Sequence, residues 1–401
     1  MGGLFEDVED EIYREKRVLK EEYQPDEILE RDSEVEEYKH ALTDALFGRS
    51  PDNIFLFGKA GVGKTAVTNF VLSELQHEAL RRDTADKIHV TKVNCNNQSV
   101  YSTVRHLVNS LRPDDTATFP KKGPSTADAF EELYAQMERL GGTHLFVLDE
   151  IDHLSNPDPL LYEFPRARAN GHIEEAKVGL IGISNNYTFR NTLSAKVKST
   201  LMEHEISFST YDAGELKTIL TDRAQRAFVD GACVESAISA CAAFAAKDDG
   251  SARQAIDLLR EAADAAQKTG STTVTAEHVE RVRQQVNRGQ LRDKIDDQTM
   301  HAQLVLEAVA RQQLADDESV RTKRVQQRYE AVADAWGHDH LTSLKSIQNH
   351  LDDLHMLGFL IRTDENKGQT GGRSYRWEVD MNLETVIEAR EEIEHDAQPP
   401  E

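Results

Sequence analysis

Short apolar runs alternate with amphipathic stretches over the first half of the chain. Four runs have the length and composition of buried strands, namely 53–57, 88–93, 144–148 and 178–184. Apolar residues recur at helical spacing in the stretches between them, at 35–46, 64–80, 101–111 and 130–140. A continuous apolar run is typical of a strand covered on both faces. Strands that alternate with helices therefore predict a parallel sheet wrapped by helices.

The pattern changes after Asp212, a residue whose side chain is well suited to cap a helix. From there to about residue 288 the apolar spacing is helical, and no strand signal interrupts it. The predicted helices cover 213–228, 234–247, 253–268 and 276–287. This part of the chain is predicted to be an all-helical domain, and the polar residues 288–297 to be a linker or a helix extension.

A third pattern occupies residues 298–380. Leucine and isoleucine recur there at 3-3-4-3-3 spacing, at Leu341, Leu344, Ile347, Leu351, Leu354 and Leu357. This spacing predicts a helix with one buried face, which Thr342 caps at the start and Gly358 ends. Residues 359–363 and 374–379 alternate like strands around the glycine-rich segment 366–373. The order predicts a helix followed by a β-hairpin.

Charge adds information about the solvent. Lys and Arg number 47 and Asp and Glu 71, which gives a net charge of −24. Residues 1–37 carry −10 of this charge and residues 383–401 carry −6. Excess carboxylate suits a protein in concentrated salt, where a Debye length of about 3 Å at 1 M screens self-repulsion. The charge predicts a halophilic origin, and an acidic mesophilic protein is the alternative.

Length and composition exclude several classes of protein. A chain of 401 residues is expected to form two or three domains. No apolar run is long enough to span a membrane, and the acidic N-terminus lacks a secretion signal. The three cysteines have neither a disulfide framework nor zinc-ligand spacing. We therefore expect a cytoplasmic protein without a structural metal.

The strongest motif is GKAGVGKT at Gly58–Thr65, which fits G-x-x-x-x-G-K-[ST] and lies between a predicted strand and a predicted helix. Its glycines let backbone N–H groups turn toward phosphates, and the helix N-terminus favours negative charge. Lys64 is expected to reach the β- and γ-phosphates, and Thr65 to ligate Mg²⁺. The expected cofactors are ATP or ADP with Mg²⁺. The predicted ATP contacts here are Gly58, Ala60, Gly61, Val62, Gly63, Lys64, Thr65 and Ala66.

Two later strands end in polar residues. The apolar run 145–148 delivers Asp149 and Glu150 at its carboxyl end, where ligands of such sheets bind. Asp149 is predicted to hold Mg²⁺, and Glu150 to polarise the attacking water. The third strand ends at Ser184 and is followed by Asn185, which either orients the water or the γ-phosphate or belongs to an ordinary turn.

The order of these motifs resembles the archaeal origin recognition/cell division control initiator family. The resemblance rests on GKAGVGKT, VLDEID and IGISNN, on FSTYDA at 208–213, and on GSARQAIDLLR at 250–260. Members of that family are AAA+ ATPases, so the resemblance implies an α/β P-loop sheet followed by an all-helical lid and a C-terminal winged-helix domain. The expected division is an acidic extension (1–37), a nucleotide-binding base (38–210), a lid (211–295), a winged helix (296–382) and an acidic tail (383–401).

The resemblance also implies roles for single residues. Asn185 corresponds to a first sensor and acts with Glu150 in catalysis, and Arg253, which opens a lid helix, corresponds to a second sensor. Tyr211 and Arg223 match positions that border the nucleotide between base and lid. The helix at 101–111 is similar to the family's DNA-contacting insertion, in which Arg105 is the candidate phosphate contact.

One position departs from the family pattern. The segment 194–198 commonly contains an arginine that acts on a neighbouring subunit, and this chain has Lys196 there. Lysine cannot reproduce the planar, bidentate fork of arginine. We therefore expect an ATP-held switch with slow turnover.

The C-terminal pattern matches a winged helix, whose helix enters the major groove and whose hairpin follows the DNA backbone. The helix face opposite the apolar one presents Lys345 and Asn349. Residues 321–328 carry four bases and no acid, including Arg324 and Arg328. The hairpin tip adds Lys367 and Arg373, with Arg376 as a weaker candidate; a solvated face or a protein contact is the alternative for the whole set.

The sequence thus predicts an ATP-regulated replication initiator associated with the nucleoid. Its expected partners are double-stranded origin DNA, the replicative MCM helicase and other copies or paralogues on DNA, without a membrane. The alternative is a winged-helix AAA+ regulator of transcription or plasmid maintenance that does not act at origins. Because concentrated salt weakens counterion release, we expect DNA binding to rely on a few placed arginines, groove fit and DNA deformation, and to depend only weakly on salt.

Overall fold

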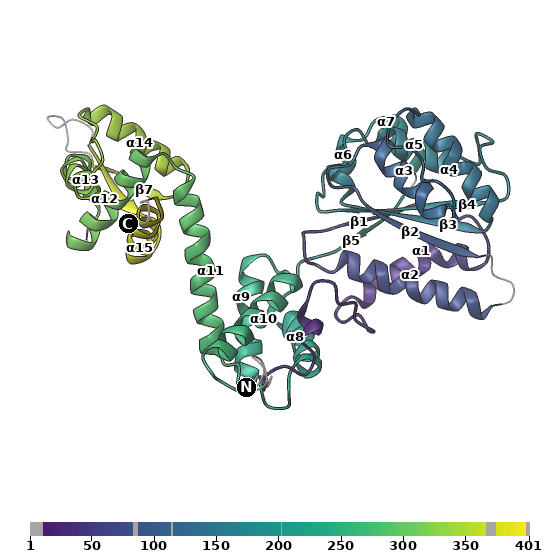
Figure 1. Ribbon diagram of the computed structural model, residues 1–401, viewed down its shortest axis with the longest axis horizontal. Coiled ribbons are helices and arrows are strands. Elements are labelled where there is room, and N and C mark those ends of the chain that lie inside the picture. Colours follow the sequence, from purple (N-terminus) through teal and green to yellow (C-terminus); the bar gives the residue numbers. More distant parts are fainter. Residues whose placement is uncertain are drawn as a thin grey trace, which may run out of the picture. The chain divides into compact units, whose positions relative to one another are not determined.

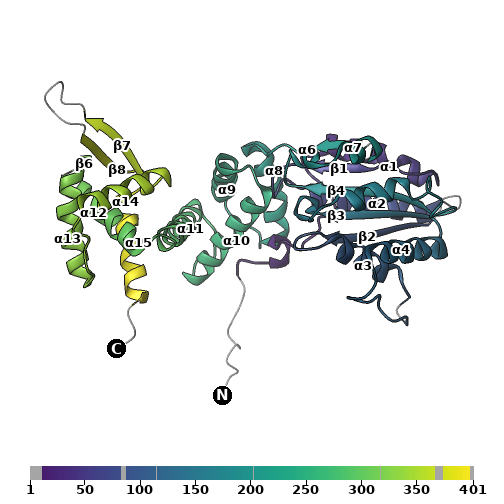
Figure 2. The same ribbon diagram turned by 90° about the horizontal axis from the view of Figure 1, so that it is seen from above.

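The computed structural model describes residues 11–82, 87–113, 115–201, 203–316, 318–365 and 374–397 (Figures 1 and 2). The chain divides into two compact units, Met1–Val279 and Glu280–Glu401, and each is described by itself. Lys367 and Arg373, two of the candidate DNA contacts, lie outside the described residues. Within the described ranges no helix is long and apolar enough to cross a membrane.

The first unit contains a five-stranded parallel sheet with the order β2-β3-β4-β1-β5. Its strands are β1 (Ile54–Phe57), β2 (Ile88–Asn94), β3 (Thr143–Asp149), β4 (Lys177–Ser184) and β5 (His204–Ser207). The first four agree with the predicted runs within one or two residues. The carboxyl ends of β1, β4 and β3 are neighbours in this order, so the segments that follow them meet at one edge of the sheet.

Helices cover both faces of this sheet, as the alternation of strands and helices predicts. α1 and α2 lie on one face, and α3, α4, α5 and α7 on the other (Figure 1). Their bounds are α1 Asp32–Leu46, α2 Lys64–Arg81, α3 Val100–Leu111, α4 Thr126–Leu140, α5 Asp158–Arg166, α6 Phe189–Thr192 and α7 Ala195–Leu201. Successive strand residues point to opposite faces: Leu56 packs on the α1–α2 side, and Phe55 and Phe57 pack on the other.

Three helices and part of a fourth complete the first unit. They are α8 (Ala213–Ala227), α9 (Glu235–Asp248), α10 (Ala252–Lys268) and the start of α11 (Ala276–Asp296). Asp212 caps α8 as predicted, because its side chain accepts the N–H groups of Gly214 and Glu215 at 2.7 and 2.9 Å. The helical region therefore begins where the sequence indicates.

The N-terminal residues do more than extend the chain. Arg14 donates its backbone N–H to the Ala227 carbonyl at 2.8 Å, at the end of α8. Both Tyr13 Oη and Lys16 Nζ bind the Asp264 carboxylate on α10, at 2.5 and 2.6 Å. A short 3₁₀ turn at Lys16–Leu19 buries its two apolar residues. The start of the described part of the expected acidic extension is thus packed on the lid helices, and its last residues, from Asp32 on, already belong to α1.

The second unit builds one core from helices and a small antiparallel sheet with the order β6-β8-β7 (Figure 2). Its elements are α12 (Met300–Asp316), β6 (Val320–Arg321), α13 (Thr322–Trp336), α14 (Leu344–Met356), β7 (Leu360–Glu365), β8 (Ser374–Val379) and α15 (Leu383–Ala397). The helix α14 followed by the β7–β8 pair is the predicted winged-helix order. Trp377 on β8 and Tyr329 on α13 are fully buried in the core.

Three expectations for this unit need correction. α14 begins at Leu344 after Ser343, so Thr342 is not its cap, and Leu357 is 59% exposed because the helix ends before it. The expected acidic tail is instead the helix α15 over Leu383–Ala397, which buries Val386, Ala389 and Ile393 in the core. Its apolar positions follow helical spacing, which the surrounding carboxylates obscure in the sequence.

Candidate nucleotide site and nucleic-acid surface

The GKAGVGKT loop connects β1 to α2 in a conformation that needs glycine. Gly61 and Gly63 have φ values of +78° and +94°, where a side chain is strained. The lid also approaches closely: a Cβ on Gly61 would lie 1.9 Å from Ser251 Oγ, and one on Gly63 2.8 Å from Tyr211 Oη. Ala252 N–H donates to the Gly61 carbonyl at 3.0 Å. The loop is therefore in direct contact with the start of α10.

Lys64 places its ammonium group inside the loop. Nζ donates to the carbonyls of Gly58 and Lys59, each at 2.7 Å, and to Asn185 Oδ1 at 2.8 Å. Burial lowers the pKa of Lys64 to about 8, and the nearby Asp149 carboxylate opposes this shift. A phosphate at this position would supply the negative charge that the loop carbonyls supply only as dipoles.

Oxygen ligands suitable for Mg²⁺ lie beside Lys64. Thr65 Oγ1 is 3.2 Å from Asp149 Oδ2, and burial raises the pKa of Asp149. Among the described residues, no group of three or more His, Cys, Asp or Glu side chains forms a metal site by itself. One hydroxyl and one carboxylate fit Mg²⁺, which is usually held by one or two protein oxygens together with substrate phosphates.

The predicted catalytic carboxylate is held by a residue that the sequence analysis did not single out. Glu150 has a φ of +54°, and its Oε2 accepts a hydrogen bond from Asn94 Nδ2 at 3.2 Å. Asn94 ends β2 and stands opposite Asp149 in the sheet register. A polar residue at the end of a neighbouring strand is the signal that would have identified it.

The lid supplies the remaining candidates. Arg253 at the start of α10 forms an ion pair with Glu21 at 3.0 Å, and both side chains are more than half exposed. Arg223 on α8 stacks on Tyr23, with its guanidinium carbon 4.6 Å from the ring centroid, and burial lowers the pKa of Arg223. Tyr211 is buried, and burial raises its pKa to about 12.

These residues line one cavity of about 500 Å³ in the first unit. Its lining includes Ala60, Gly61, Gly63, Lys64, Thr65, Ala66, Asp149, Glu150, Asn185, Tyr211, Arg223 and Arg253. Gly58 and Val62 do not line it; the side chain of Val62 is fully buried in the core of the unit. Residues 18–25 form part of the wall, a contribution for which the sequence carries no motif.

Lys196 lies on α7, away from this cavity. Its Nζ is 3.6 Å from the ring centroid of Tyr162 on α5, and the Arg166 guanidinium carbon is 5.3 Å from the same ring. Lys196 is exposed. The structure thus displays a cation at the surface where the family pattern has an arginine.

The candidate DNA contacts differ in their availability. Lys345 and Asn349 are exposed on α14. On α13, Arg324 pairs with Asp316 at 2.6 Å, and Arg328 Nε donates to Gln312 Oε1 at 3.2 Å. Exposed ion pairs are weak, so Arg324 remains able to exchange its carboxylate for a phosphate.

Two further basic side chains are restricted by contacts within the unit or by partial burial. Arg376, the weaker candidate, donates to the Ser319 carbonyl at 2.7 Å and serves to join β8 to the segment before β6. Arg105 is half-buried on α3, whose apolar face packs against α4 and the sheet. Of the described candidates, Lys345, Asn349 and Arg324 are exposed, whereas Arg105, Arg328 and Arg376 are half-buried.

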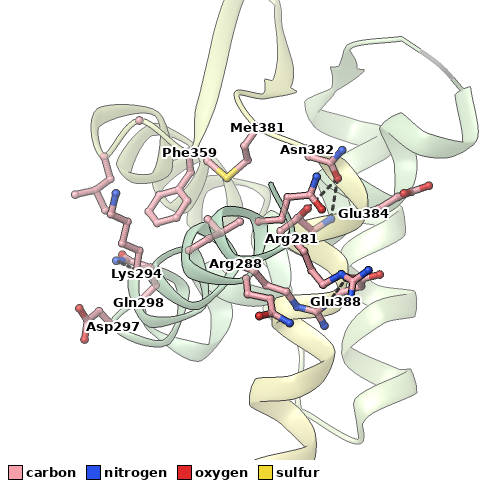
Figure 3. Close-up of a pocket in the computed structure, with 16 residues that line it drawn as sticks. Arg281, Arg288, Lys294, Asp297, Gln298, Phe359, Met381, Asn382, Glu384 and Glu388 are labelled. Atoms are coloured by element: carbon pink, nitrogen blue, oxygen red, sulfur yellow. Dashed lines mark hydrogen bonds and ion pairs between the residues drawn. The ribbon is translucent and has the colours of Figure 1, made fainter. Parts of the chain in front are cut away.

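The second unit also contains an open cavity of about 1050 Å³ between α11, α15 and the end of α14 (Figure 3). Arg288 on α11 pairs there with Glu388 of α15 at 2.7 Å, and the floor includes Leu291, Phe359 and Met381. Arginines and carboxylates both line it, so it has no clear preference for a charged ligand. None of the predicted site residues lines this cavity.

Comparisons with known proteins agree with this arrangement. The chain matches the AAA domain family over residues 48–185, the Cdc6 AAA+ ATPase-type lid domain over 217–284, and the CDC6 C-terminal winged helix domain over 293–389. It is 47% identical over 380 residues to ORC1-type DNA replication protein 8 of Halobacterium salinarum, covering 94% of this chain and 96% of the relative. It is 40% identical over 389 residues to ORC1-type DNA replication protein 15 of Haloarcula marismortui, covering 96% and 93%.

A solved structure shows the same architecture. The Aeropyrum pernix ORC1 protein in complex with DNA has a TM-score of 0.64 and 30% identity to this chain, with 96% of this chain and 98% of that chain covered. The expected halophilic origin fits the organisms of the two sequence relatives. The predicted AAA+ sheet, helical lid and winged helix are confirmed.

Proposed function

Because this chain belongs to the ORC1/Cdc6 family of AAA+ replication initiators, we propose that it is an ATP-regulated initiator that binds duplex origin DNA and helps to recruit or load the MCM helicase. One observation supports regulation by ATP. A single cavity gathers the phosphate loop, the carboxyl ends of three strands and two arginines of the lid. A nucleotide in this cavity would touch base and lid together, so its phosphates set the contact between them.

The residues divide the work by their chemistry. Lys64 and the loop N–H groups bind the β- and γ-phosphates, and Asn185 keeps Lys64 aligned through its 2.8 Å hydrogen bond. Thr65 and Asp149 would hold Mg²⁺, which supplies charge neutralisation at the phosphates. Glu150 accepts a proton from the attacking water, and Asn94 fixes the orientation of its carboxylate.

Arg253 gives the lid its response to the γ-phosphate. In the structure its partner is the Glu21 carboxylate at 3.0 Å, so the side chain already pairs with an anionic group at the cavity wall. An arginine binds phosphate bidentately, and a change of partner would move the start of α10. Because Lys196 replaces the arginine expected at the neighbour-facing site, we propose slow hydrolysis and a long-lived ATP state.

For DNA, we propose two kinds of contact. Lys345 and Asn349 on α14 face the major groove, and Arg324, Arg328 and Arg105 contact phosphates. Lys367 and Arg373 are proposed as hairpin contacts, and they lie outside the described residues. The support is the exposure of the α14 pair and the likeness to an ORC1 protein that was solved in complex with DNA.

Mapping replication start sites in living cells tests the initiator function. Deleting the gene is expected to abolish firing at one or more origins, and the Glu150→Gln variant to restore firing while hydrolysis is slowed. Unchanged start sites together with altered transcription would instead support a regulator. Co-purification with MCM in ATP but not in ADP is the expected result for helicase recruitment, and equal recovery in both nucleotides would contradict ATP control.

A further inference from the structure

Arg31 is a buried arginine that joins three parts of the nucleotide-binding unit. It directly precedes α1, and its side chain is 2% exposed. Removing a guanidinium from water is unfavourable unless nearby oxygen atoms accept its hydrogen bonds. The buried guanidinium of Arg31 must therefore find acceptors within the folded chain.

The guanidinium group bonds to backbone carbonyls of separate segments. Its Nε and Nη2 both donate to the Val62 carbonyl in the phosphate loop, each at 3.2 Å. Nη2 also donates to the Ser209 carbonyl, in the connection between β5 and α8, at 2.7 Å. Nη1 forms an ion pair with the Glu34 carboxylate at 3.3 Å, which balances the charge. One side chain thus links loop, connection and α1.

The same group stacks on an aromatic ring of the cavity. The Arg31 guanidinium carbon is 3.6 Å from the ring centroid of Tyr211, and 5.7 Å from that of Phe208. The hydroxyl end of Tyr211 lies against Gly63, where a Cβ would be only 2.8 Å from Oη. Arg31 therefore supports the loop directly through Val62 and indirectly through Tyr211.

The orientation of the Val62 carbonyl explains why this support matters. A phosphate loop binds its ligand with N–H groups that point inward, so a carbonyl that faces away from the ligand, such as that of Val62, must find its donor elsewhere in the chain. Arg31 supplies two donors to the outward Val62 carbonyl and fixes the neighbouring Ser209 carbonyl with the same planar group. Lysine has no such fork and stacks less well on a ring.

We propose that Arg31 is a positioning residue that fixes the phosphate loop against the base–lid connection at residues 209–212. It touches no nucleotide itself; it sets the loop geometry on which nucleotide affinity and lid movement depend. The inference rests on the nucleotide-binding role proposed above.

The test compares Arg31→Lys with Arg112→Lys in the full-length chain. Arg112 lies in the same unit outside the cavity, is 18% exposed, and also forms a fork, to Glu132 and to the Ala117 carbonyl. ADP affinity is measured with a fluorescent analogue, and thermal melting without nucleotide is recorded for both. We expect Arg31→Lys to weaken ADP binding at least about tenfold and Arg112→Lys to change it less than about twofold at a comparable loss of melting temperature. Near wild-type affinity in Arg31→Lys, or equal losses in both, would overturn the inference.

A double-variant cycle separates positioning from a general effect on folding. If Arg31 acts partly through Tyr211, the losses from Arg31→Lys and Tyr211→Leu will not multiply in the double variant. Fully multiplicative losses would overturn the indirect route. Arg31→Gln replaces Arg31→Lys if the latter does not fold. Lys64→Ala tests the proposed function separately. If Lys64→Ala still binds ADP, the proposed nucleotide-binding function is contradicted. If Lys64→Ala loses ADP binding while the Arg31 variant binds ADP normally, only the inference about Arg31 is contradicted.

Discussion

Replacing Gly61 by alanine tests whether the lid rests on the phosphate loop. Gly61 has a φ of +78°, and an added Cβ would lie 1.9 Å from Ser251 Oγ and 3.0 Å from Ser251 Cβ. Two effects are combined in this variant, the strained backbone conformation and the collision with the lid. Gly231 provides a control for the first effect, because its φ is +81° and nothing lies within 4 Å of an added Cβ.

The expected magnitudes differ clearly. A left-handed alanine costs about 1–2 kcal/mol at either position. The collision of the added Cβ with Ser251 costs a further amount of about 1–3 kcal/mol at Gly61 alone. This cost appears either as strain while α10 stays in contact with the loop, or as displacement of α10. Since about 1.4 kcal/mol corresponds to a tenfold change in affinity, ADP binding by Gly61→Ala should weaken about 5- to 150-fold. Gly231→Ala should bind ADP within about twofold of the original chain.

The assay is ADP titration of the two variants and of the double variant Gly61→Ala/Ser251→Ala. Removing Ser251 Oγ takes away the closest contact, so the double variant should recover part of the lost affinity. Wild-type affinity in Gly61→Ala would refute the contact between lid and loop. A complete lack of recovery in the double variant would show that the contact with Ser251 Oγ does not cause the loss.

Four other predictions address charged groups at the nucleotide site and recognition of DNA. The pKa of Lys64 is lowered to about 8 in the folded chain, so between about pH 8 and its ordinary value near 10.5 the unfolded chain holds a proton that the folded chain has released, and this group favours folding as pH rises through that window. ADP restores the charged form, so binding at pH 8.5 should take up protons; calorimetry in two buffers measures the uptake, which should disappear at about pH 6, where Lys64 is already charged before ADP binds. Glu21→Gln removes the ion pair of Arg253 and should raise ATP affinity about two- to fivefold more than ADP affinity, with Glu22→Gln as the unchanged control in the same titrations. Asn349→Ala should relax sequence preference in a binding-site selection without a uniform loss of affinity, and a uniform loss would assign Asn349 to the phosphates. DNA affinity should fall only weakly from low to molar KCl. A steep slope of log affinity against log salt concentration would contradict binding through a few basic side chains.

The predictable part of the fold is the part with local signals. The phosphate loop and its flanking strand and helix follow from eight consecutive residues at 58–65, and four strands follow from continuous apolar runs. The fifth strand, β5, could not be predicted in this way, since its sequence His-Glu-Ile-Ser has a single buried residue, Ile206, at the edge of the sheet. The short helices α5, α6 and α7 likewise have too few turns for a periodic signal.

The candidate site shows the same division. Lys64, Thr65 and Asp149 follow from motifs, because the chemistry of phosphate and Mg²⁺ requires those residue types near one another. Arg31 gives no such signal, since its partners Val62 and Ser209 are 31 and 178 residues away along the chain. The terminal segments differ from the expectation for a related reason: their carboxylates suggest solvation, whereas a few apolar residues determine their packing.

Nuclease footprinting of chromosomal fragments with purified protein in ATP, in ADP and without nucleotide tests whether nucleotide controls binding to origin DNA. We expect a discrete protected sequence whose extent differs between ATP and ADP, and a Lys64→Ala variant whose footprint no longer responds to nucleotide. Identical protection in all three conditions, or no sequence preference at all, would contradict an ATP-regulated origin-binding protein.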